Sequence, residues 1–570
     1  MLVIAATVAI SVYGLRLSRT TSDFLVASRA VSPTWNAAAI GGEYLSAASF
    51  LGVAGFVLAF GADALWYPVG FVAGYLVLLV LVAAPLRRSG AYTLPDFVEI
   101  RLGSPVVRRI CSLVVVGIGL LYLVPQLQGA GLTLRATTGA PAWLGAVVVA
   151  AVVTTTVAGG GMRSATFVQA FQYWLKLTAL AVPAVFLVLA WRADGAPGLA
   201  HPARPVFSGV TAVRVDAPVQ VDVPVLTAVR IDGQPRTLLP GRQALPEGST
   251  VEFPDDAPVP HVVGLEAATG QDWARPLSGA GGAAHPLYST YALVLATFLG
   301  TMGLPHVLVR FYTNPDGVAA RRTTLLVIAL LGVFYLLPPV YGALGRLHTP
   351  ELFLTGRTDA VVLALPGAVF PGPLGHLLTA LLVAGAFAAF LSTSSGLLVA
   401  TAGVLLQDVL RGSVRDFRIA AAGAAAAALL LTLPGGGLPV VQVVGLAFAV
   451  AASTLCPLLV LGIWWRGLTA WGAGAGLLVG AVLSATAVLT TLTGTVTTGW
   501  PAALLAAPAA WTVPLTFAVM IGTSAATRHT APRDVDRTML RLHAPEALGL
   551  ALDPDRSSRR TDRSSPGKGD

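Results

Sequence analysis

The chain has 570 residues, of which 55% are hydrophobic and only 11% are charged, and its mean hydropathy is +0.76. A soluble protein carries about a quarter charged residues, so this composition excludes a soluble globular domain. The net charge of +9 does not indicate nucleic-acid binding, because the basic residues lie in loops between apolar segments and in the carboxyl-terminal tail.

The apolar residues fall in blocks of about 20 residues, which is the length of a helix that crosses a ~30 Å hydrocarbon core. Helices are expected rather than barrel strands, because the blocks do not alternate between polar and apolar residues. The first block has no basic residues before it, so we interpret it as a span and not as a signal peptide. The sequence therefore predicts an all-α polytopic membrane protein with about 13 transmembrane helices, at residues 2–17, 34–59, 64–86, 110–134, 142–159, 165–191, 288–309, 323–345, 373–400, 418–433, 438–465, 469–491 and 503–526.

Arginines follow every second predicted span and are rare in the loops between. Arg87 and Arg88, for example, follow the third span, whereas the opposite short loops hold only Arg135, Arg346 and Arg357. Loops rich in Lys and Arg stay on the cytoplasmic side of a membrane. We therefore expect a multi-pass protein of the cell membrane, with its amino terminus outside and its carboxyl terminus in the cytoplasm.

Two polar segments interrupt this pattern. Residues 193–287 form an insertion that the topology places outside the cell; valine alternates with polar residues around 213–222, which predicts either a small β-rich flap or a mostly disordered loop. The tail is polar and is expected to be a disordered cytoplasmic segment. The predicted division is therefore spans one to six in 1–192, the insertion in 193–287, spans seven to thirteen in 288–527, and the tail in 528–570.

Glu43 lies inside the second predicted span, directly after Gly41 and Gly42. A charge at the bilayer centre costs roughly 2.5–3.5 kcal/mol, so it needs a partner or a watery cavity. Each glycine weakens a helix by about 1 kcal/mol relative to alanine. Together these residues predict a broken helix near the midplane, where transporters place ions and substrate. The alternative is a tightly packed helix in which Glu43 is hydrogen-bonded to a neighbour.

Four consecutive hydroxyl residues, Ser392 to Ser395, lie in the ninth predicted span. A hard cation such as sodium binds neutral oxygens, including hydroxyls and main-chain carbonyls freed from helix pairing. The alternative is that these hydroxyls bond back to carbonyls one turn earlier in their own helix. Taken alone, the cluster favours this alternative.

Pro305 bends the seventh predicted span, because it removes a helix hydrogen bond. His306 and Arg310 follow it and share one face near the cytoplasmic end of the span. We expect His306 to be a structural histidine. Arg310 is expected to meet lipid headgroups or a loop carboxylate, for which Asp408 is a candidate.

No motif indicates catalysis. The sequence has no phosphate-binding glycine loop with a lysine, no paired-histidine metal motif and no paired carboxylates within one span. Cys111 and Cys456 both lie in apolar spans, so we expect neither a disulfide nor a metal site from them. We predict that the chain is not an enzyme, uses no cofactor and binds no nucleic acid.

Four stretches resemble the sodium/solute symporter family, and most closely its acetate permease branch. They are Gly42–Gly52, Gly300–His306, Val444–Ser453 and Thr469–Gly480. The resemblance covers roughly residues 20–192 and 288–525 and leaves out the insertion and the tail. It implies thirteen spans around a LeuT-type core of two inverted five-helix repeats, within residues 34–191 and 288–491.

The resemblance also implies a site. The family's sodium site uses main-chain carbonyls of the first core helix and hydroxyls of the eighth. On this chain these positions are Ala37, Ile40, Ala389, Ser392 and Thr393. Substrate in the family lies beside the unwound parts of the first and sixth core helices. The corresponding residues are Gly41, Gly42, Glu43, Tyr44, Gly300, Thr301 and Gly303.

Two positions depart from the family pattern. Many members carry an Asp on the fifth core helix for a further cation site, and this chain has Gln169 there, so we expect one cation per substrate. Acetate permeases usually have Asp at the position of Glu43, and the longer side chain could change the size of the substrate.

These observations predict a symporter that imports a small, acetate-like monocarboxylate with a cation, expected to be sodium, by alternating access. Within transport, the alternatives are a proton-coupled carrier or a carrier of another solute, such as pyruvate, proline or urea. Outside it, the alternative is a membrane sensor that uses the same fold and moves nothing. The expected partners are a small-molecule carboxylate and the lipid bilayer, and the sequence does not indicate an oligomeric state.

Overall fold

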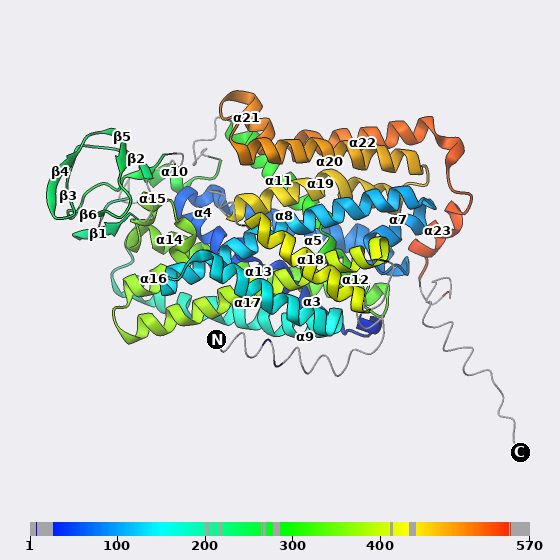
Figure 1. Ribbon diagram of the computed structural model, residues 1–570, viewed down its shortest axis with the longest axis horizontal. Helices are drawn as coiled ribbons and strands as arrows, with labels where there is room; N and C mark the ends of the chain where they lie inside the picture. Colours follow the sequence, from blue (N-terminus) through cyan, green and yellow to red (C-terminus); the bar gives the residue numbers. More distant parts are fainter. Residues whose placement is uncertain are drawn as a thin grey trace, which may run out of the picture.

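The computed structural model describes residues 27–199, 205–263 with gaps at 208 and 216–218, 265, 270–277, 285–410, 414–432, 440–545 and 548, together with Thr7 and Ala9. The helices lie side by side in one bundle that follows the long axis of the molecule. Small β-sheets lie at one end of the bundle, and α7 (Leu94–Leu102) and α23 (Val535–His543) lie at the other (Figure 1).

The first half of the bundle runs from residue 33 to residue 193. Its main helices are α3 (Pro33–Tyr44), α4 (Val53–Phe60), α5 (Trp66–Val77), α6 (Ala83–Arg88), α8 (Pro105–Thr138) and α9 (Ala142–Ala193). Three short helical segments join them: η2 (Ala48–Gly52), η3 (Gly61–Leu65) and η4 (Leu78–Val82). A straight helix of the length of α9 would measure about 78 Å, far more than one bilayer core. Accordingly, α9 consists of two helices joined at Gly161, where φ is 56° and ψ is −151°.

The second half begins after the insertion. Its main helices are α11 (Pro286–Gly303), α12 (Pro305–Phe311), α13 (Gly317–Tyr335), α14 (Pro338–His348), α17 (Pro373–Leu405), α18 (Val414–Thr432), α19 (Val440–Trp464), α20 (Ala470–Thr493) and α22 (Ala509–Ala526). Shorter elements are α15 (Leu352–Thr355), η5 (Thr358–Ala360), α16 (Val361–Val369), η6 (Leu406–Leu410), α21 (Gly499–Ala506) and η7 (Arg528–Thr530).

Within the described residues, eight helices are long and apolar enough to cross a bilayer, and the bent pair α11 and α12 makes a ninth if it counts as one span. Two of the eight, Ala48–Arg88 and Ala142–Ala193, contain the glycine breaks at Gly61 and Gly161. The prediction of an all-α multi-pass membrane protein is therefore confirmed. The number thirteen and the orientation stay predictions, and the first predicted span, 2–17, lies outside the described residues except for Thr7 and Ala9.

Each half of the bundle begins with an interrupted helix. The first helix, α3, ends at Tyr44, and the chain becomes helical again at Ala47. In the second half the interruption is Leu304, between α11 and α12, and the two helices meet at 45°. Pro305 explains this position, because proline has no N–H to continue α11 and suits the first turn of a new helix. The break in the first half lies after Tyr44 and not at Gly41 and Gly42, which are helical.

Within the residues that the structure describes, the insertion has seven strands in two antiparallel sheets. The strands are β1 (Thr211–Arg214), β2 (Val219–Val223), β3 (Thr227–Ile231), β4 (Gln234–Leu238), β5 (Gly241–Leu245), β6 (Thr250–Phe253) and β7 (His261–Val262). The sheet orders are β1-β6-β3-β4 and β5-β2-β7. The alternating valines explain the strands, because Val213, Val221 and Val223 are buried while their neighbours are more exposed. Phe207 stacks on Phe253 with ring centroids 4.6 Å apart.

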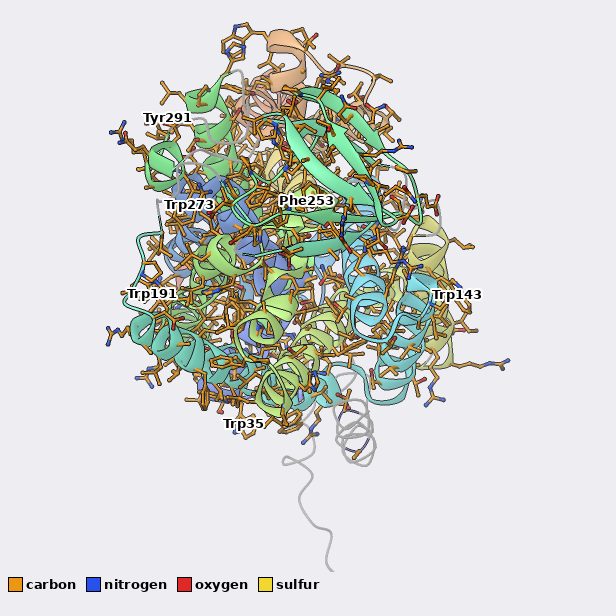
Figure 2. All side chains as sticks on the ribbon, turned by 90° about the vertical axis from the view of Figure 1, so that its left-hand side faces the viewer. Trp35, Trp143, Trp191, Phe253, Trp273 and Tyr291 are labelled. Atoms are coloured by element: carbon orange, nitrogen blue, oxygen red, sulfur yellow. The ribbon has the colours of Figure 1, made fainter. Side chains whose placement is uncertain are left out.

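The insertion is anchored to the bundle through α10 (Gly270–Ala274). The indole N–H of Trp273 donates to the main-chain oxygens of Val57, at 2.9 Å, and Leu58, at 3.1 Å. These carbonyls belong to the last turn of α4. The Arg346 guanidinium lies 5.2 Å from the centroid of the Trp273 ring. Figure 1 shows α10 between the sheets and α4, and Figure 2 labels Trp273 to the left of Phe253, which belongs to β6.

We expect Trp273→Ala to loosen the insertion without unfolding the bundle, because the change removes a ring that is only 7% exposed and two hydrogen bonds to α4. Limited proteolysis of the purified protein should then cut the insertion at least about tenfold faster, since each 1.4 kcal/mol of lost docking energy is a factor of ten. Trp143→Ala is the control, because that ring is 58% exposed. Equal cleavage rates in the two variants would contradict the anchoring role.

Candidate substrate and cation site

A buried ion pair joins the two interrupted helices. Glu43 lies in the last turn of α3, and its Oε2 accepts a hydrogen bond of 2.6 Å from Nε of Arg310 on α12. The side chains are 1% and 0% exposed, respectively. The position of Glu43 in a membrane span is thereby explained, because a buried charge needs a partner of opposite sign.

Arg310 also binds the first half of the bundle. Its remaining nitrogens donate to Oγ1 of Thr166, at 2.8 Å, and to Oε1 of Gln169, both on α9. The expectation that Arg310 meets lipid headgroups or Asp408 is therefore wrong. Asp408 instead forms an ion pair with Arg108, which also binds acidic residues on and beside α7. Arg310 was misplaced because the sequence pattern puts it near a helix end, whereas the break at Leu304 starts a new buried helix.

The hydroxyls of the ninth predicted span meet the end of α3. Ser392 Oγ donates to the main-chain oxygen of Gly42, and Thr393 Oγ1 donates to that of Glu43, both at 2.6 Å. Ser392 Oγ also lies 3.1 Å from the main-chain oxygen of Ala389. The last four carbonyls of a helix have no partner within it, and these two hydroxyls supply partners. The structure thus brings Ala389, Ser392 and Thr393 to α3.

Ala37 and Ile40, the other two predicted cation ligands, lie one to two turns before this end of the helix. Both are buried residues inside α3, whose regular part extends to Tyr44. Carbonyls within a regular α-helix are paired with N–H groups four residues later. The oxygens that face Ser392 and Thr393 are therefore those of Gly42 and Glu43, not those of Ala37 and Ile40.

Lys176, on α9, reaches the same carbonyls. Its Nζ donates to the main-chain oxygen of Leu45 at 2.8 Å, to Oγ of Ser392 at 2.9 Å, and to the main-chain oxygen of Gly42. The side chain is fully buried. An ammonium group has three hydrogens to donate, and each has an acceptor here. The positive group lies at the carboxyl end of α3, where the helix dipole favours a cation.

Lys176 was not among the residues predicted from the sequence, although its position in a predicted span is a recognisable signal. The residue lies inside the sixth predicted span, and a lysine within a transmembrane segment indicates a functional site by itself. Gln169, two turns before it on the same helix, links the two charged groups: its Oε1 accepts from Arg310 and its Nε2 donates to the main-chain oxygen of Ser392 at 2.9 Å. The position at which many family members carry Asp is thus part of this network.

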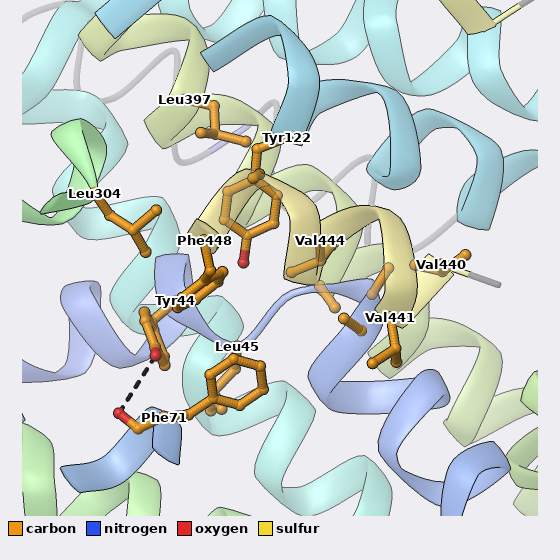
Figure 3. Packing of buried hydrophobic residues seen from close by; sticks show 14 of the residues in the cluster. Tyr44, Leu45, Phe71, Tyr122, Leu304, Leu397, Val440, Val441, Val444 and Phe448 are labelled. Carbon is orange, nitrogen blue, oxygen red and sulfur yellow. Dashed lines mark hydrogen bonds between the residues drawn. The ribbon is translucent and has the colours of Figure 1, made fainter. Parts of the chain in front are cut away.

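Aromatic side chains pack against one another beside the two breaks. Tyr44 lies in edge-to-face contact with Tyr75, with ring centroids 5.0 Å apart, and Phe448 packs on Phe71 at the same distance. The Tyr44 hydroxyl lies 2.8 Å from Oγ1 of Thr301 and donates to the main-chain oxygen of Phe71 at 3.3 Å. Figure 3 shows Tyr44, Phe71 and Phe448 converging, with Tyr122 above them. Among the predicted substrate residues, Tyr44 and Thr301 are therefore in direct contact.

His306 is buried in the first turn of α12, and its ring lies 5.3 Å from that of Tyr122. Among the described residues, neither ring nitrogen has a hydrogen-bond partner. The same holds for the Tyr75 hydroxyl and for Oε1 of Glu43. Buried polar atoms are nearly always paired in folded proteins, so unpaired ones gathered beside both breaks indicate a place for a polar ligand. The expectation of a structural, hydrogen-bonded His306 does not match this geometry.

The four predicted glycines serve close packing. A Cβ at Gly42 would collide with the main-chain oxygen of Gln169, and one at Gly41 would touch the Tyr173 ring, so both admit α9 against α3. In the same way, Gly300 and Gly303 let α11 approach the backbone of α19. The glycines therefore do not unwind the helices. Gly41 and Gly42 allow α9, the helix that carries Lys176 and Gln169, to approach the end of α3.

Comparison with known proteins agrees with this arrangement. The profile of the sodium:solute symporter family matches residues 24–196 and 280–480. The chain belongs to this family. A protein of Corynebacterium glutamicum named monocarboxylic acid transporter is 30% identical over 82% of this chain and 79% of its own length. The uncharacterized symporter YwcA of Bacillus subtilis is 27% identical over 90% of this chain and 91% of its own length.

Among solved structures, the fold resembles a Na⁺-coupled sialic acid symporter in a substrate-bound, outward-open state. The TM-score is 0.57 at 13% identity, over 91% of this chain and 96% of that chain. The resemblance at this identity concerns the fold, which is the LeuT-type architecture. As a member of the family, the chain is a transporter and not an enzyme.

The ion pair between Glu43 and Arg310 should behave as one unit in stability measurements. Glu43→Gln and Arg310→Met each leave one buried charge unpaired, so we expect each to lower the free energy of unfolding by about 3–5 kcal/mol. The double variant should lose clearly less than the sum, because neither charge remains. Thermal unfolding of the purified protein in detergent, analysed as a double-mutant cycle, measures this. Additive losses would show that the pair is not coupled.

Gly42→Ala should separate α9 from α3, because the added Cβ overlaps the main-chain oxygen of Gln169. Overpacking of this kind costs about 1–3 kcal/mol. The matched control is Gly332→Ala in α13, where nothing lies within 4 Å of the added atom and alanine is the better helix former. We expect a lower midpoint of thermal unfolding for Gly42→Ala only. A midpoint equal to that of the control would refute the close approach.

Proposed function

We propose that this symporter imports a small monocarboxylate of the acetate type, coupled to a cation gradient, by alternating access. The observation that carries the proposal is the charge balance at the helix breaks. Two basic residues, Lys176 and Arg310, lie beside one acidic residue, Glu43, so the formal charge of the three side chains is two minus one, or +1. A buried site with a positive excess favours an anionic ligand over a neutral or cationic one.

An ionised Glu43 without a partner would repel an anionic substrate. Its charge is compensated by Arg310, at a hydrogen-bond distance of 2.6 Å, which leaves Lys176 as the excess charge. The relative named monocarboxylic acid transporter supports the same class of substrate.

The driving cation and the orientation in the membrane are proposed as the sequence predicts them. Sodium is the cation expected from the family, and the proton is the alternative. The amino terminus would lie outside the cell and the carboxyl terminus in the cytoplasm. During transport, the halves of α3–η2–α4 and α11–α12 would tilt against each other, because the breaks leave no continuous helix to resist bending.

The test is uptake of radiolabelled acetate into proteoliposomes that contain the purified protein. An inward sodium gradient is compared with an inward proton gradient, and pyruvate, propionate, proline and urea are added as competitors. Competition by monocarboxylates only, with uptake driven by one of the gradients, is the expected result. Competition by proline or urea would replace the substrate class, and substrate binding without flux would favour a sensor.

Glu43→Asp is expected to retain part of the uptake, because it keeps the charge that faces Arg310. Glu43→Gln should lower uptake by about tenfold or more, since an unpaired Arg310 costs well over the 1.4 kcal/mol that corresponds to a factor of ten. Both variants are compared at equal amounts of reconstituted protein. Full activity in Glu43→Gln would show that the carboxylate charge is not needed.

A further inference from the structure

Lys176 lies against the hydroxyls of α17 that the family resemblance assigns to a sodium site. These hydroxyls meet carbonyls at the end of α3. Of the five expected sodium ligands, the Nζ atom of Lys176 binds the Oγ of Ser392. Its other two acceptors are the main-chain oxygens of Gly42, at the end of α3, and of Leu45, just beyond it.

We propose that the ammonium group of Lys176 replaces the sodium ion between α3 and α17, so that this symporter binds no sodium there. The fold requires a donor or a cation at this place. It binds the carbonyl oxygens that the helix break leaves without N–H partners, and it thereby holds α3, α9 and α17 together. The lysine performs this task from within the chain.

The geometry fits an ammonium ion rather than a metal ion. The distances from Nζ to the Leu45 and Ser392 oxygens, 2.8 and 2.9 Å, are those of charge-assisted hydrogen bonds. Three oxygens match three ammonium hydrogens, whereas a hard metal ion of this size takes about six or more oxygen ligands. Sodium would have to share these oxygens with a positive group less than 3 Å from each of them, which like-charge repulsion in a buried place opposes.

The charged groups around Lys176 support the same conclusion. On α3, the acidic residue is Glu43, and Glu43 already binds Arg310 of α12. On α17, the neighbours are the neutral hydroxyls of Ser392 and Thr393. On α9 itself, the neutral amide of Gln169 binds both Arg310 and the main-chain oxygen of Ser392. In the described part of the chain, no second carboxylate is placed to balance both the lysine and a sodium ion.

For its statement about transport, this inference rests on the proposed function. Of the two candidate driving cations, it favours the proton over sodium. Its main test does not need a substrate. Thermal unfolding of the purified full-length protein in detergent is followed while sodium chloride replaces potassium chloride at constant ionic strength. We expect equal midpoints in the two salts for the wild type and for Lys176→Arg, which keeps the charge.

Lys176→Asn removes the ammonium and adds a neutral oxygen, so it should gain stabilisation by sodium that potassium does not give. The same titration in Lys176→Asn/Ser392→Ala should lose this gain, because a ligand is missing. A sodium-specific rise of the midpoint in the wild type that disappears in Ser392→Ala would overturn the inference. So would a folded Lys176→Asn that does not respond to sodium.

The flux measurement separates this inference from the proposed function. In proteoliposomes at fixed pH and membrane potential, replacing sodium by choline should change acetate uptake by the wild type less than about twofold, whereas an about tenfold fall would mean that a bound ion is missing. Absence of acetate uptake in every medium would contradict the proposed substrate, and the stability titration would still decide whether Lys176 replaces sodium.

Discussion

The structure depends on how the broken end of α3 is satisfied inside a membrane. A helix that stops at Tyr44 leaves carbonyl oxygens without N–H partners, and lipid offers no water to bind them. Here the partners are side chains: Ser392 and Thr393 from α17 and Lys176 from α9. Gln126 of α8 accepts from the Ala47 N–H just after the break, at 3.0 Å. The break therefore selects which helices surround it and how close they come.

The same requirement connects the two halves of the bundle. Arg310 belongs to the second interrupted helix, yet its guanidinium binds Glu43 of the first and two side chains of α9. Gln169 continues the chain of contacts to α17. Each interrupted helix is thus held by charges and amides that belong to other helices. A shift of one interrupted helix necessarily changes the partners of the other, which is the kind of coupling that a symporter needs between its binding steps.

Much of the fold could be predicted from the sequence, because span length and hydropathy are local properties. Glu43 also stood out, because a carboxylate in an apolar span is rare, whereas Ser392 and Thr393 were assigned to a site only through the family resemblance. The sequence could not show which residues of neighbouring helices lie opposite one another. The carbonyls that meet the hydroxyls lie later on α3 than Ala37 and Ile40, and the glycines before Glu43 admit α9 instead of unwinding the helix. Such details depend on which helix packs where, and that is a tertiary property.

Two charged residues differ from what the sequence predicted. Lys176 lies within a predicted span, where a charged side chain is rare, but it lies outside the four stretches that carry the family resemblance. Arg310 was noticed but given the wrong partner, because its distance along the chain from Pro305 suggested a helix end at the membrane surface. Only the bend of 45° after Gly303 turns that residue inward, toward Glu43.

The contact of Trp273 with α4 has a mechanical consequence. Its indole is bonded to the last turn of the helix that follows the first break, so the far end of that helix is fastened to the insertion. Any swing of α4 about the break must either carry α10 with it or rupture two hydrogen bonds. The polar insertion is therefore fastened to α4, and a probe attached to its sheets would report a swing of that helix.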